Sequence, residues 1–444
     1  MSEKLTFSKS IDVPKKQYDV VVVGGGTSGC VSAISALREK LSVLIVDSQS
    51  GLGGSQTSGL VTPTMDMFMP DDSKKKSSID RMINEKLQKI DGCNPRYNAA
   101  FNPIHTQLVL EKMINDNGGD VLLNVSIADV IKNDSSIDYV LLATKNGLIA
   151  VKGKYYIDCT GDADLCRLCG VKTYSGNDDG LNQNISLRFE MGGVDIPKYE
   201  EFKKKVDSSD GGWHKFMQEK YEQGYIRQDD VYHFQTFRIW GKPNCLSFNC
   251  PELGRDRNVA DSEYISKKLI EGKQAIYKLA TFCRKFIEGF ENAYILQISN
   301  MLGIRESYRI DAQYILKTDD IFSYQKFNDG IAVTNYPLDA HGEKDYGAGL
   351  QEYVEAPKDE QYFEVPFRCL VPKGIDNVLC AGRCIGADFF SQSSIRIQHT
   401  CRYMGEAAGI GAKFAIENGK KNYEIDGKAV RKLMADYGAE MLKK

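Results

Sequence analysis

A short apolar run followed at once by a glycine-rich loop constrains the fold of this chain more than any other feature of its sequence. Tyr18–Val23 (YDVVVV) lacks the alternation of a half-exposed strand and predicts a strand buried on both faces of a parallel sheet. The next six residues, Gly24–Gly29 (GGGTSG), have the G-x-G-x-x-G spacing of a tight turn that lets the backbone approach a pyrophosphate. A helical segment (SGCVSAISALREK) and a second buried strand ending at Asp47 follow. Together they predict a βαβ unit that binds a dinucleotide.

Length and composition place the chain among ordinary globular proteins. Its 444 residues predict two to three domains, and 42% hydrophobic and 26% charged residues are typical values. No apolar stretch approaches the ~20 residues of a membrane span, and the first residues lack the pattern of a signal peptide. We therefore expect a cytoplasmic protein whose twelve cysteines are thiols. A net charge of −3 gives no basic footprint for nucleic acid or anionic lipid.

The dinucleotide-binding signals are split between two parts of the chain. Residues 175–360 are rich in aromatic and long charged side chains and include a predicted helix at Ser262–Phe286. A buried strand returns in Asn377–Arg383 (NVLCAGR), before a small-residue helix from about Ser394 to Asn418. We predict an α/β fold, in which a discontinuous Rossmann-like domain (residues 1–170 and 361–444) carries an inserted α+β substrate or cap domain (171–360).

Two features favour FAD over NAD as the dinucleotide. Gly53 and Gly54 lie just beyond Asp47, where an elongated dinucleotide continues past its phosphates. Gly382–Arg383, at the end of a buried strand, adds a second contact region. The helix that begins near Ser394 is expected to aim its positive end at the flavin. The discontinuous domain is therefore predicted to be a FAD-binding domain, with Asp47 accepting hydrogen bonds from the ribose hydroxyls.

Seven segments resemble successive motifs of the FAD-dependent oxidoreductase family related to the fumarate reductase flavoprotein and to glutathione-reductase-like flavoproteins. They are VVVGGGTSGC, VDSQSGLGG, YYIDCTGDAD, MLGIRESYRI, YPLDAH, LVPKGIDNVLCAGRCIGAD and CRYMGEAAGIGA. The resemblance spans nearly the whole chain and implies FAD as the cofactor, but no particular substrate. It implies FAD contacts at Gly24, Gly26, Gly29, Asp47, Gly53, Gly54, Gly161, Asp162, Gly382 and Arg383. The predicted cofactor site also includes Thr27, Ser28, Ser48, Ser55, Ile127 and Ser394.

Two positions depart from the pattern of these relatives. Many relatives carry a histidine shortly after the AGRC segment, where this chain has Phe389, and they often have proline where this chain has His399. The role of the family histidine is therefore not carried over to this chain. His399 remains a candidate because of its place in the sequence.

The segment Tyr336–His341 holds the main candidate for proton transfer. On an extended backbone, Asp-x-His spacing puts Asp339 and His341 on one face, where the carboxylate can orient the imidazole and raise its basicity. Such a histidine can take a hydroxyl proton while a hydride leaves for the flavin, or give a proton in the opposite direction. The family resemblance supports this position, and a structural histidine is the alternative.

Arginines supply the candidates for holding an anionic substrate. Arg305 and Arg309 lie four residues apart, so they would share a face of a helix, and in relatives this segment lies close to the flavin. We predict that Arg305 binds a carboxylate or a developing oxyanion and that Arg309 is structural. Tyr232–Trp240 is predicted to be a strand, with His233 and Arg238 as second-rank pocket residues.

The sequence thus predicts a FAD-dependent oxidoreductase that exchanges a hydride between flavin and a small hydroxylated or carboxylated metabolite. The electron acceptor, the reaction direction and any homo-oligomer are left open. One alternative is a dithiol oxidoreductase that uses Cys166 and Cys169. Cys380 and Cys384 are a second possible redox pair of the same kind. The other is an accessory subunit that passes electrons from its flavin to a partner. No cluster has metal-ligand spacing, so no metal is predicted.

Overall fold

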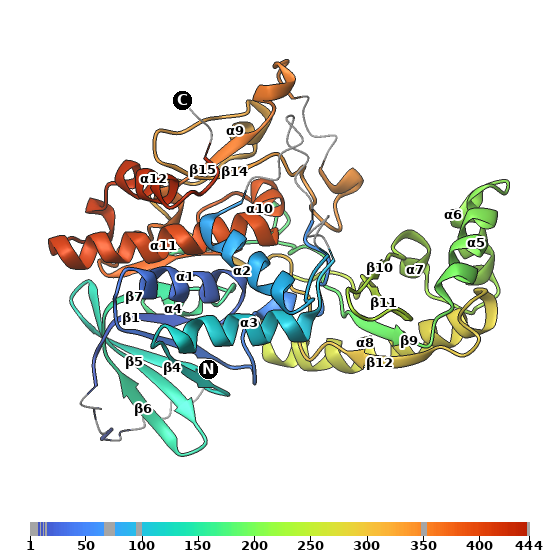
Figure 1. Cartoon of the computed structure of the whole chain (residues 1–444), viewed down its shortest axis with the longest axis horizontal. Coiled ribbons are helices and arrows are strands. Elements are labelled where there is room, and N and C mark those ends of the chain that lie inside the picture. Colours follow the sequence, from blue (N-terminus) through green and yellow to red (C-terminus); the bar gives the residue numbers. More distant parts are fainter. Residues whose placement is uncertain are drawn as a thin grey trace.

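A five-stranded parallel sheet forms the centre of the computed structural model, which describes residues 8, 10–11, 13, 16–65, 76–94, 100–347 and 353–441 (Figure 1). The strand order is β16-β7-β1-β2-β3, and every neighbouring pair is parallel. The strands are β1 (Tyr18–Val23), β2 (Val43–Asp47), β3 (Asp120–Leu123), β7 (Gly153–Asp158) and β16 (Val378–Cys380). The four valines of β1 are buried, which suits a strand covered on both faces. The predicted α/β class is confirmed.

Two helices from opposite ends of the chain pack along each other beside this sheet. These helices are α1 (Thr27–Arg38) and α11 (Gln398–Asn418). Their close approach depends on glycines of α11. A Cβ at Gly405 would lie 2.5 Å from the carbonyl oxygen of Ser28, and one at Gly409 would lie 2.5 Å from the Cβ of Ser35. The C-terminal segment therefore completes the layer that the N-terminal βαβ unit begins.

A three-stranded antiparallel sheet and three helices complete the N-terminal part. The sheet consists of β4 (Ser126–Asn133), β5 (Ser136–Thr144) and β6 (Gly147–Val151), which lead into β7. The helices are α2 (Ser78–Lys89), α3 (Pro103–Asp116) and α4 (Asp164–Leu168). Both α2 and α3 pack against α1.

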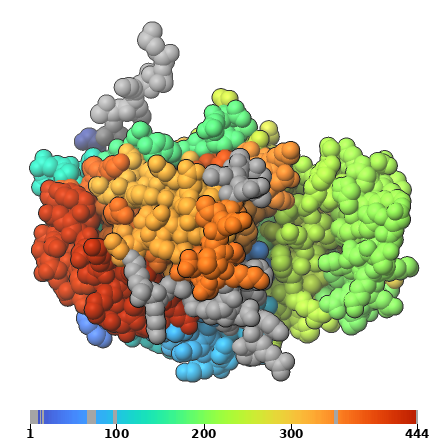
Figure 2. Space-filling view, turned by 90° about the horizontal axis from the view of Figure 1, so that it is seen from above, coloured from blue at the N-terminus to red at the C-terminus, as the bar shows by residue number. Residues whose placement is uncertain are grey.

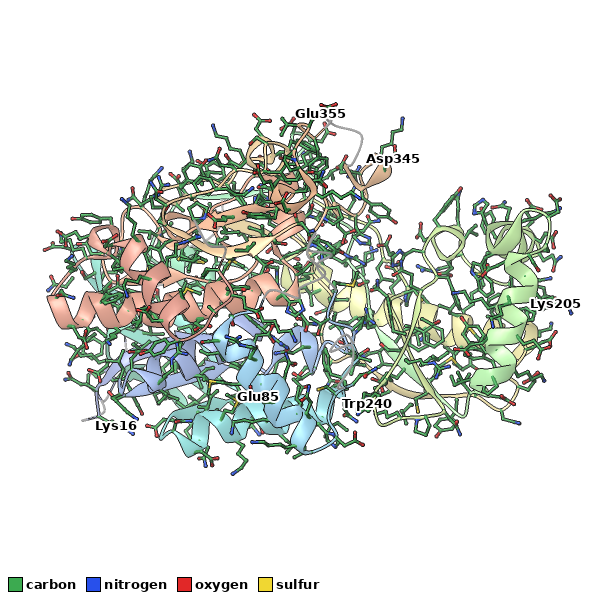
Figure 3. The ribbon with its side chains drawn as sticks, turned by 45° about the horizontal axis from the view of Figure 1, so that its top comes forward. Lys16, Glu85, Lys205, Trp240, Asp345 and Glu355 are labelled. Carbon is green, nitrogen blue, oxygen red and sulfur yellow. The ribbon has the colours of Figure 1, made fainter. Side chains whose placement is uncertain are left out.

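The middle of the chain forms a second lobe around an antiparallel sheet of order β10-β11-β9-β12 (Figure 1). Its strands are β9 (Phe189–Gly192), β10 (Thr236–Arg238), β11 (Cys245–Phe248) and β12 (Tyr294–Ile298). Its helices are α5 (Ile196–Asp207), α6 (Gly212–Glu222), α7 (Gln228–Tyr232) and α8 (Ser262–Phe286), the last with the predicted bounds. Figure 3 shows Lys205 at the outer end of this lobe and Trp240 where it meets the first lobe. There the indole N–H of Trp240 donates to Asp91 Oδ1 at 2.9 Å.

The remaining elements belong to the first lobe. They are β8 (Thr173–Ser175) paired with β13 (Tyr308–Ile310), β14 (Gly330–Thr334) paired with β15 (Phe363–Pro366), α9 (Thr318–Phe322), α10 (Phe389–Ile395) and α12 (Gly427–Asp436). Residues from Ile310 onward join the main hydrophobic core, whereas the core of the second lobe runs from Ile185 to Leu302. This second core is shorter than the insert expected at 171–360, and the domain boundaries stay a prediction.

The helix expected from Ser394 starts later than the sequence suggests. Helix α10 ends at Ile395, Ile397 is extended (φ −67°, ψ 153°), and α11 begins at Gln398. Serine hydroxyls that bond to backbone carbonyls compete with a continuous helix. Ser393 donates to the carbonyl of Phe390, and Ser394 to that of Tyr336.

Two further local expectations are wrong. Arg305 lies in an irregular segment before β13 rather than on a helix with Arg309, because this stretch crosses between the lobes and pairs with β8. The strand expected at 232–240 shrinks to β10, since α7 already occupies residues up to Tyr232.

All twelve cysteines are free thiols. Among the described residues, no helix combines the length and apolar character required to cross a bilayer.

Candidate active site

One large cavity opens where the parallel strands end. Residues at or just after the ends of four strands line it, namely Val23, Asp47, Cys159 and Ala381, as do residues of the second lobe. Ligands of α/β sheets bind at this edge. Its volume of about 1110 Å³ exceeds the roughly 300–1,000 Å³ of most single-ligand pockets. Figure 2 shows the second lobe, in green, packed beside the orange and red segments of the first. The cavity therefore has room for an extended cofactor together with a substrate.

The glycine loop forms one end of this cavity. Gly24 has φ +95°, and a Cβ there would lie 2.5 Å from the carbonyl oxygen of Cys159. A Cβ at Gly29 would lie 1.8 Å from the carbonyl oxygen of Gly24. At Gly26, in contrast, a Cβ would meet no protein atom within 4 Å, and this residue lines the cavity. Packing therefore requires glycine at positions 24 and 29. Gly26 instead keeps open the space at the N-terminus of α1, where a phosphate binds favourably.

Asp47 lies beside this loop at the end of β2. Its Oδ2 accepts the Gly25 N–H at 2.5 Å, and its Oδ1 accepts the Gln49 N–H at 2.7 Å. Burial raises the pKa of Asp47, while these two backbone hydrogen bonds act in the opposite direction. A carboxylate has about four acceptor positions, so two are left for the ribose hydroxyls of a dinucleotide.

Arg383 and its neighbours form a second contact region. Its Nη2 donates to Asp162 Oδ1 at 2.7 Å, and a Cβ at Gly161 would lie 2.5 Å from its Nη1. The Nε–H of Arg383 is buried and has no hydrogen-bond partner in the described part of the chain. Because Arg383 lines the cavity, this free donor suits an acceptor atom of a bound flavin nucleotide.

Most of the predicted cofactor residues lie on the cavity wall: Gly24, Gly26, Thr27, Ser28, Asp47, Ser48, Gly54, Ser55, Ile127, Gly161, Asp162, Gly382 and Arg383. Three do not. Gly29 is buried in α1, Gly53 donates its N–H to the carbonyl of Gly25 at 2.8 Å, and Ser394 is buried on α10. The helix end that meets the cavity belongs instead to α11, through Ile397 and Gln398. The open face at Gly26, the acceptor Asp47 and the donor Arg383 together fit FAD.

The contrast between two glycines gives a test of this cofactor site. Gly26→Ala is expected to weaken FAD binding by about tenfold or more, because its methyl group enters the space of the pyrophosphate. The free energy of unfolding of the FAD-free protein should stay within about 0.5 kcal/mol of wild type. Both quantities are measured, by FAD titration and by urea unfolding.

Gly29→Ala is the matched control. Its methyl group would collide with the backbone of Gly24, so it should destabilise the FAD-free protein by about 1–3 kcal/mol or more. Equal FAD affinity in wild type and Gly26→Ala would place the pyrophosphate elsewhere.

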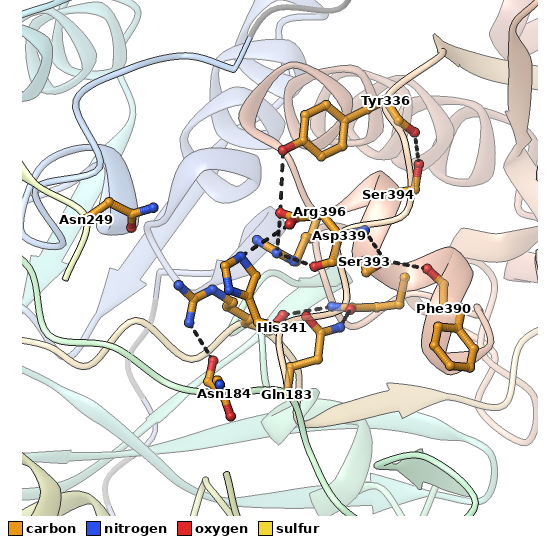
Figure 4. Close-up of polar contacts among 12 residues, drawn as sticks. Gln183, Asn184, Asn249, Tyr336, Asp339, His341, Phe390, Ser393, Ser394 and Arg396 are labelled. Carbon is orange, nitrogen blue, oxygen red and sulfur yellow. Dashed lines mark hydrogen bonds and ion pairs between the residues drawn. The ribbon is translucent and has the colours of Figure 1, made fainter. Parts of the chain in front are cut away.

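The other end of the cavity holds His341 between two carboxylates (Figure 4). Its Nδ1 lies 2.6 Å from Glu252 Oε1, and its Nε2 lies 3.2 Å from Asp339 Oδ1. Asp339 also accepts from Arg396 Nη2 at 2.9 Å, and Figure 4 shows these two side chains and the imidazole pointing toward one another. Asp339 and His341 thus meet as their spacing in the sequence suggests, and Glu252 joins them from the second lobe.

Both carboxylates in this cluster are ionised. Burial alone would raise the pKa of Glu252, but the hydrogen bond with His341 and the charge of Arg305 lower it to about 2. Burial also opposes ionisation of Asp339, whose pKa is nevertheless lowered by His341 and Arg396. An ionised carboxylate only accepts hydrogen bonds, so Glu252 and Asp339 are the acceptors in this cluster.

Arg305 lines the cavity but is already paired. Its Nη2 lies 3.2 Å from Glu252 Oε1, and its Nη1 donates to the carbonyl of Asn184 at 2.6 Å. Arg309 forms a buried ion pair with Glu306 and also donates to the carbonyl of Ala387, away from the cavity. The structural reading of Arg309 agrees with these contacts. Arg305 holds Glu252 in place, and that is its visible role.

The charged residues on the cavity wall or in this cluster that the sequence-based prediction missed include Glu252, Arg188 and Arg396. No local motif marks them. Glu252 meets the cluster, and Arg188 reaches the cavity wall, only because the second lobe folds back to the first. Arg396 projects into the cavity because the chain breaks between α10 and α11. Charge within a segment that links two helices is the one signal that could have drawn attention to Arg396.

Of the two second-rank candidates, His233 lies at the cavity and Arg238 does not. His233 is buried and lines the cavity, and its ring centroid lies 5.3 Å from that of His341. Burial lowers the pKa of His233 to about 4. Arg238 instead forms an exposed ion pair with Glu200.

The remaining sequence candidates lie away from the cavity. Cys166 and Cys169 are buried near α4, and burial raises the pKa of Cys169 to about 12, so it is no ready nucleophile. Cys380 and Cys384 are also buried, with their Sγ atoms 3.3 Å apart. His399 binds Asp80 through Nδ1 at 2.7 Å, behind the wall rather than on it.

Comparisons with known proteins give the following similarities. The model of the FAD dependent oxidoreductase family matches residues 19–434. A thiamine thiazole synthase of Methanococcus vannielii is 27% identical over 154 residues, 33% of this chain and 56% of the synthase, so the match spans about half of that relative. Two solved structures align with 95% of this chain. One is a geranylgeranyl bacteriochlorophyll reductase-like protein of Thermoplasma acidophilum (13% identity, 82% of its chain, TM-score 0.43). The other is the p-nitrophenol 4-monooxygenase of Pseudomonas putida (11% identity, 87% of its chain, TM-score 0.45).

Proposed function

Because the chain belongs to the FAD-dependent oxidoreductase family and FAD is its cofactor, we propose that it exchanges a hydride between the flavin and a small hydroxylated or carboxylated metabolite. The observation that carries this proposal is a single cavity that joins the glycine loop to the cluster around His341. Cofactor and substrate can therefore lie side by side in it, between the two lobes. Bound flavin supplies the hydride acceptor or donor.

His341 is proposed to move the proton that accompanies the hydride. Glu252 and Asp339 fix its ring from two sides, and the contact of its Nε2 with Asp339 is the longer of the two. A substrate oxygen can compete for that nitrogen more readily than for Nδ1. The same ring gives a proton to the substrate in one reaction direction and takes it back in the other.

Arg305 is proposed to act through Glu252 rather than on the substrate. Its guanidinium is committed to Glu252 and to a backbone carbonyl, which leaves little of its donor fork for a carboxylate of the substrate. The expectation that Arg305 anchors an anionic group therefore loses its support.

The proposal is tested by mixing FAD-loaded protein anaerobically with a panel of small hydroxylated and carboxylated metabolites while the flavin absorbance is followed. The expected result is bleaching by one chemical class, and reoxidation of reduced flavin by the corresponding carbonyl or unsaturated compounds. An enzyme whose flavin responds to none of them, but is reduced by a purified protein partner, would be an accessory electron-transfer subunit instead.

The dithiol alternative has its own test. Replacing both Cys166 and Cys169 by alanine is expected to leave the rate of flavin reduction within about twofold of wild type, since both thiols are buried and lie outside the cavity wall. The rate is measured by anaerobic rapid mixing. A loss of flavin reduction with FAD still bound would favour the dithiol mechanism.

A further inference from the structure

Arg188 is a buried cation on the cavity wall that lacks a carboxylate partner. It lies directly before β9, opposite the end of β11. Its Nη1 donates to Asn249 Oδ1 at 2.8 Å and its Nη2 to Ser247 Oγ at 3.0 Å, and both acceptors are neutral. Its Nε–H is buried with no hydrogen-bond partner among the residues described. A buried charge is stable only when it is paired, so an anion is expected to complete this site.

The charges around Arg188 support an anion rather than a cation. Arg305 and Arg396 lie on the same cavity wall, and the carboxylates that the described residues bring to the cluster, Glu252 and Asp339, are already bound by these arginines and by His341. Positive groups therefore outnumber negative ones at this end of the cavity. The field of the site attracts a carboxylate and disfavours an ammonium group.

His233 offers a hydrogen-bond acceptor beside this cation. Its side chain is 4% exposed, and its Nε2 has no partner in the described residues. Burial keeps its pKa low, at about 4, so the ring is neutral near pH 7. The ring also forms a hydrogen bond with the backbone of Asn249, the residue whose side chain holds Arg188. Figure 4 shows Asn249 to one side of the cluster of His341, Asp339 and Arg396. A neutral imidazole nitrogen of this kind accepts from a hydroxyl group.

From this pair we infer that the enzyme binds 2-hydroxy carboxylates, with Arg188 holding the carboxylate and Nε2 of His233 accepting a hydrogen bond from the adjacent hydroxyl. The inference deepens the proposed function, since it names the substrate class of the same cavity. Asn249 connects the two groups, because its side chain accepts from Arg188 and its backbone interacts with the ring of His233. Arg188 and His233 are then the residues that determine specificity.

A divalent metal ion is the alternative ligand for the site beside His233. Donor atoms of His233, Glu252 and His341 lie within 4.8 Å of one another, and two histidines with one carboxylate form a common metal site. The arrangement around them opposes a dication, because Arg305 already pairs with Glu252 and Arg188 adds uncompensated positive charge. A metal requirement is therefore an outcome that the test must detect.

Four compounds with one carbon skeleton test the inference in the oxidised, FAD-loaded protein by calorimetric titration. They are 2-hydroxyisobutyrate, isobutyrate, 2-aminoisobutyrate and methyl 2-hydroxyisobutyrate. The first has no hydrogen on the carbon that bears the hydroxyl, so it cannot give up a hydride and binding is measured without turnover. We expect 2-hydroxyisobutyrate to bind most tightly, isobutyrate about fivefold more weakly, and the ester and the amino acid at least about tenfold more weakly.

Two variants assign the contacts. Arg188→Gln should weaken both 2-hydroxyisobutyrate and isobutyrate at least about tenfold while the ratio between them persists. His233→Phe should abolish that ratio without weakening isobutyrate. The matched controls are Arg238→Gln and His214→Phe, two surface changes in the same lobe that should leave all affinities unchanged. FAD content and melting temperature check folding, and Arg188→Met, which also removes the charge, replaces Arg188→Gln if that variant fails to fold.

Any of three binding results would overturn the inference: equal affinity for the acid and its ester, unchanged acid binding in the Arg188 variant, or acid binding that appears only with added Zn²⁺ or Fe²⁺ and disappears with a chelator. Three of the compounds have no hydrogen on carbon 2, so their binding is independent of the proposed hydride exchange; for isobutyrate, an unchanged flavin absorbance during the titration checks that it does not react. A flavin that an uncharged alcohol reduces, in a protein that binds none of the acids, would overturn this inference alone.

Discussion

Replacing His341 by glutamine is expected to slow flavin reduction by about 10²–10⁴-fold while FAD stays bound. The imidazole contacts both carboxylates of the cluster, so its loss removes the proton carrier and the link between Glu252 and Asp339. The rate is measured by anaerobic rapid mixing with the compound that reduces the wild-type enzyme. Absorbance of the purified protein gives the FAD content in the same sample.

Two comparisons make this result specific to proton transfer. His214→Gln, a change at an exposed position of α6, should leave the rate unchanged. Asp339→Asn should slow it less than His341→Gln, because Glu252 still orients the ring. A His341→Gln enzyme with the wild-type rate would remove His341 from the mechanism, whereas loss of FAD would show that the residue serves the cofactor site.

Asp80→Ala is expected to lower the free energy of unfolding by about 3–5 kcal/mol, because it leaves buried positive charge without a partner. Asp80 is fully buried and accepts from His399 Nδ1 at 2.7 Å, from Asn84 Nδ2 at 3.1 Å and from Arg402. Arg402 Nη2 in turn donates to Gln56 Oε1 at 2.7 Å, next to the Gly53-Gly54 turn. The variant should therefore also bind FAD more weakly. Urea unfolding of the FAD-free protein and FAD titration measure the two effects.

Acid should weaken the same cluster. Burial opposes ionisation of Asp80, but Arg402 and His399 lower its pKa well below the ordinary value of 3.8. A carboxylate with a lowered pKa stabilises the fold above its unfolded-state pKa, and the contribution is lost as the pH falls below about 4. In Asp80→Ala this part of the acid dependence should be missing.

The matched control for Asp80 is Asp116→Ala on α3. Asp116 pairs with Lys112 at 3.0 Å on the exposed surface, so this change should cost no more than about 0.5 kcal/mol. Asp80→Ala with an equally small effect would mean that water or a rearranged Arg402 compensates the charge, and the account of the cluster would be wrong.

The cofactor half of the molecule is readable from sequence because its signals are local. Tyr18–Val23 is a strand with the predicted bounds, since a short unbroken apolar run is typical of a strand buried on both faces of a parallel sheet. The glycine spacing is likewise a local signal, because Gly24 packs against the backbone of Cys159 and Gly29 packs against the backbone of Gly24. Helix α8 also has its predicted bounds, because its apolar positions recur at helical spacing over 25 residues.

The substrate half depends on contacts between distant segments, which local patterns do not carry. Glu252 meets His341 only when the second lobe closes on the first, and Arg188 acquires its neutral partners through the pairing of β9 with β11. The pairing of Arg305 with Glu252 is missed for the same reason, since Glu252 lies far away in sequence. For Cys166 and Cys169 the opposite holds: their spacing in the sequence resembles a redox motif, but both thiols are buried in the structure.

The exchange of a hydride between flavin and metabolite is tested most directly by an isotope. The compound that bleaches the flavin is prepared with deuterium on the carbon that donates the hydride, and both forms are mixed anaerobically with FAD-loaded protein. The account predicts that the deuterated form bleaches the flavin several times more slowly at saturating concentration, with the same final absorbance. Equal rates for the two forms, in an enzyme whose rate still depends on His341, would contradict hydride exchange as the chemistry of this cavity.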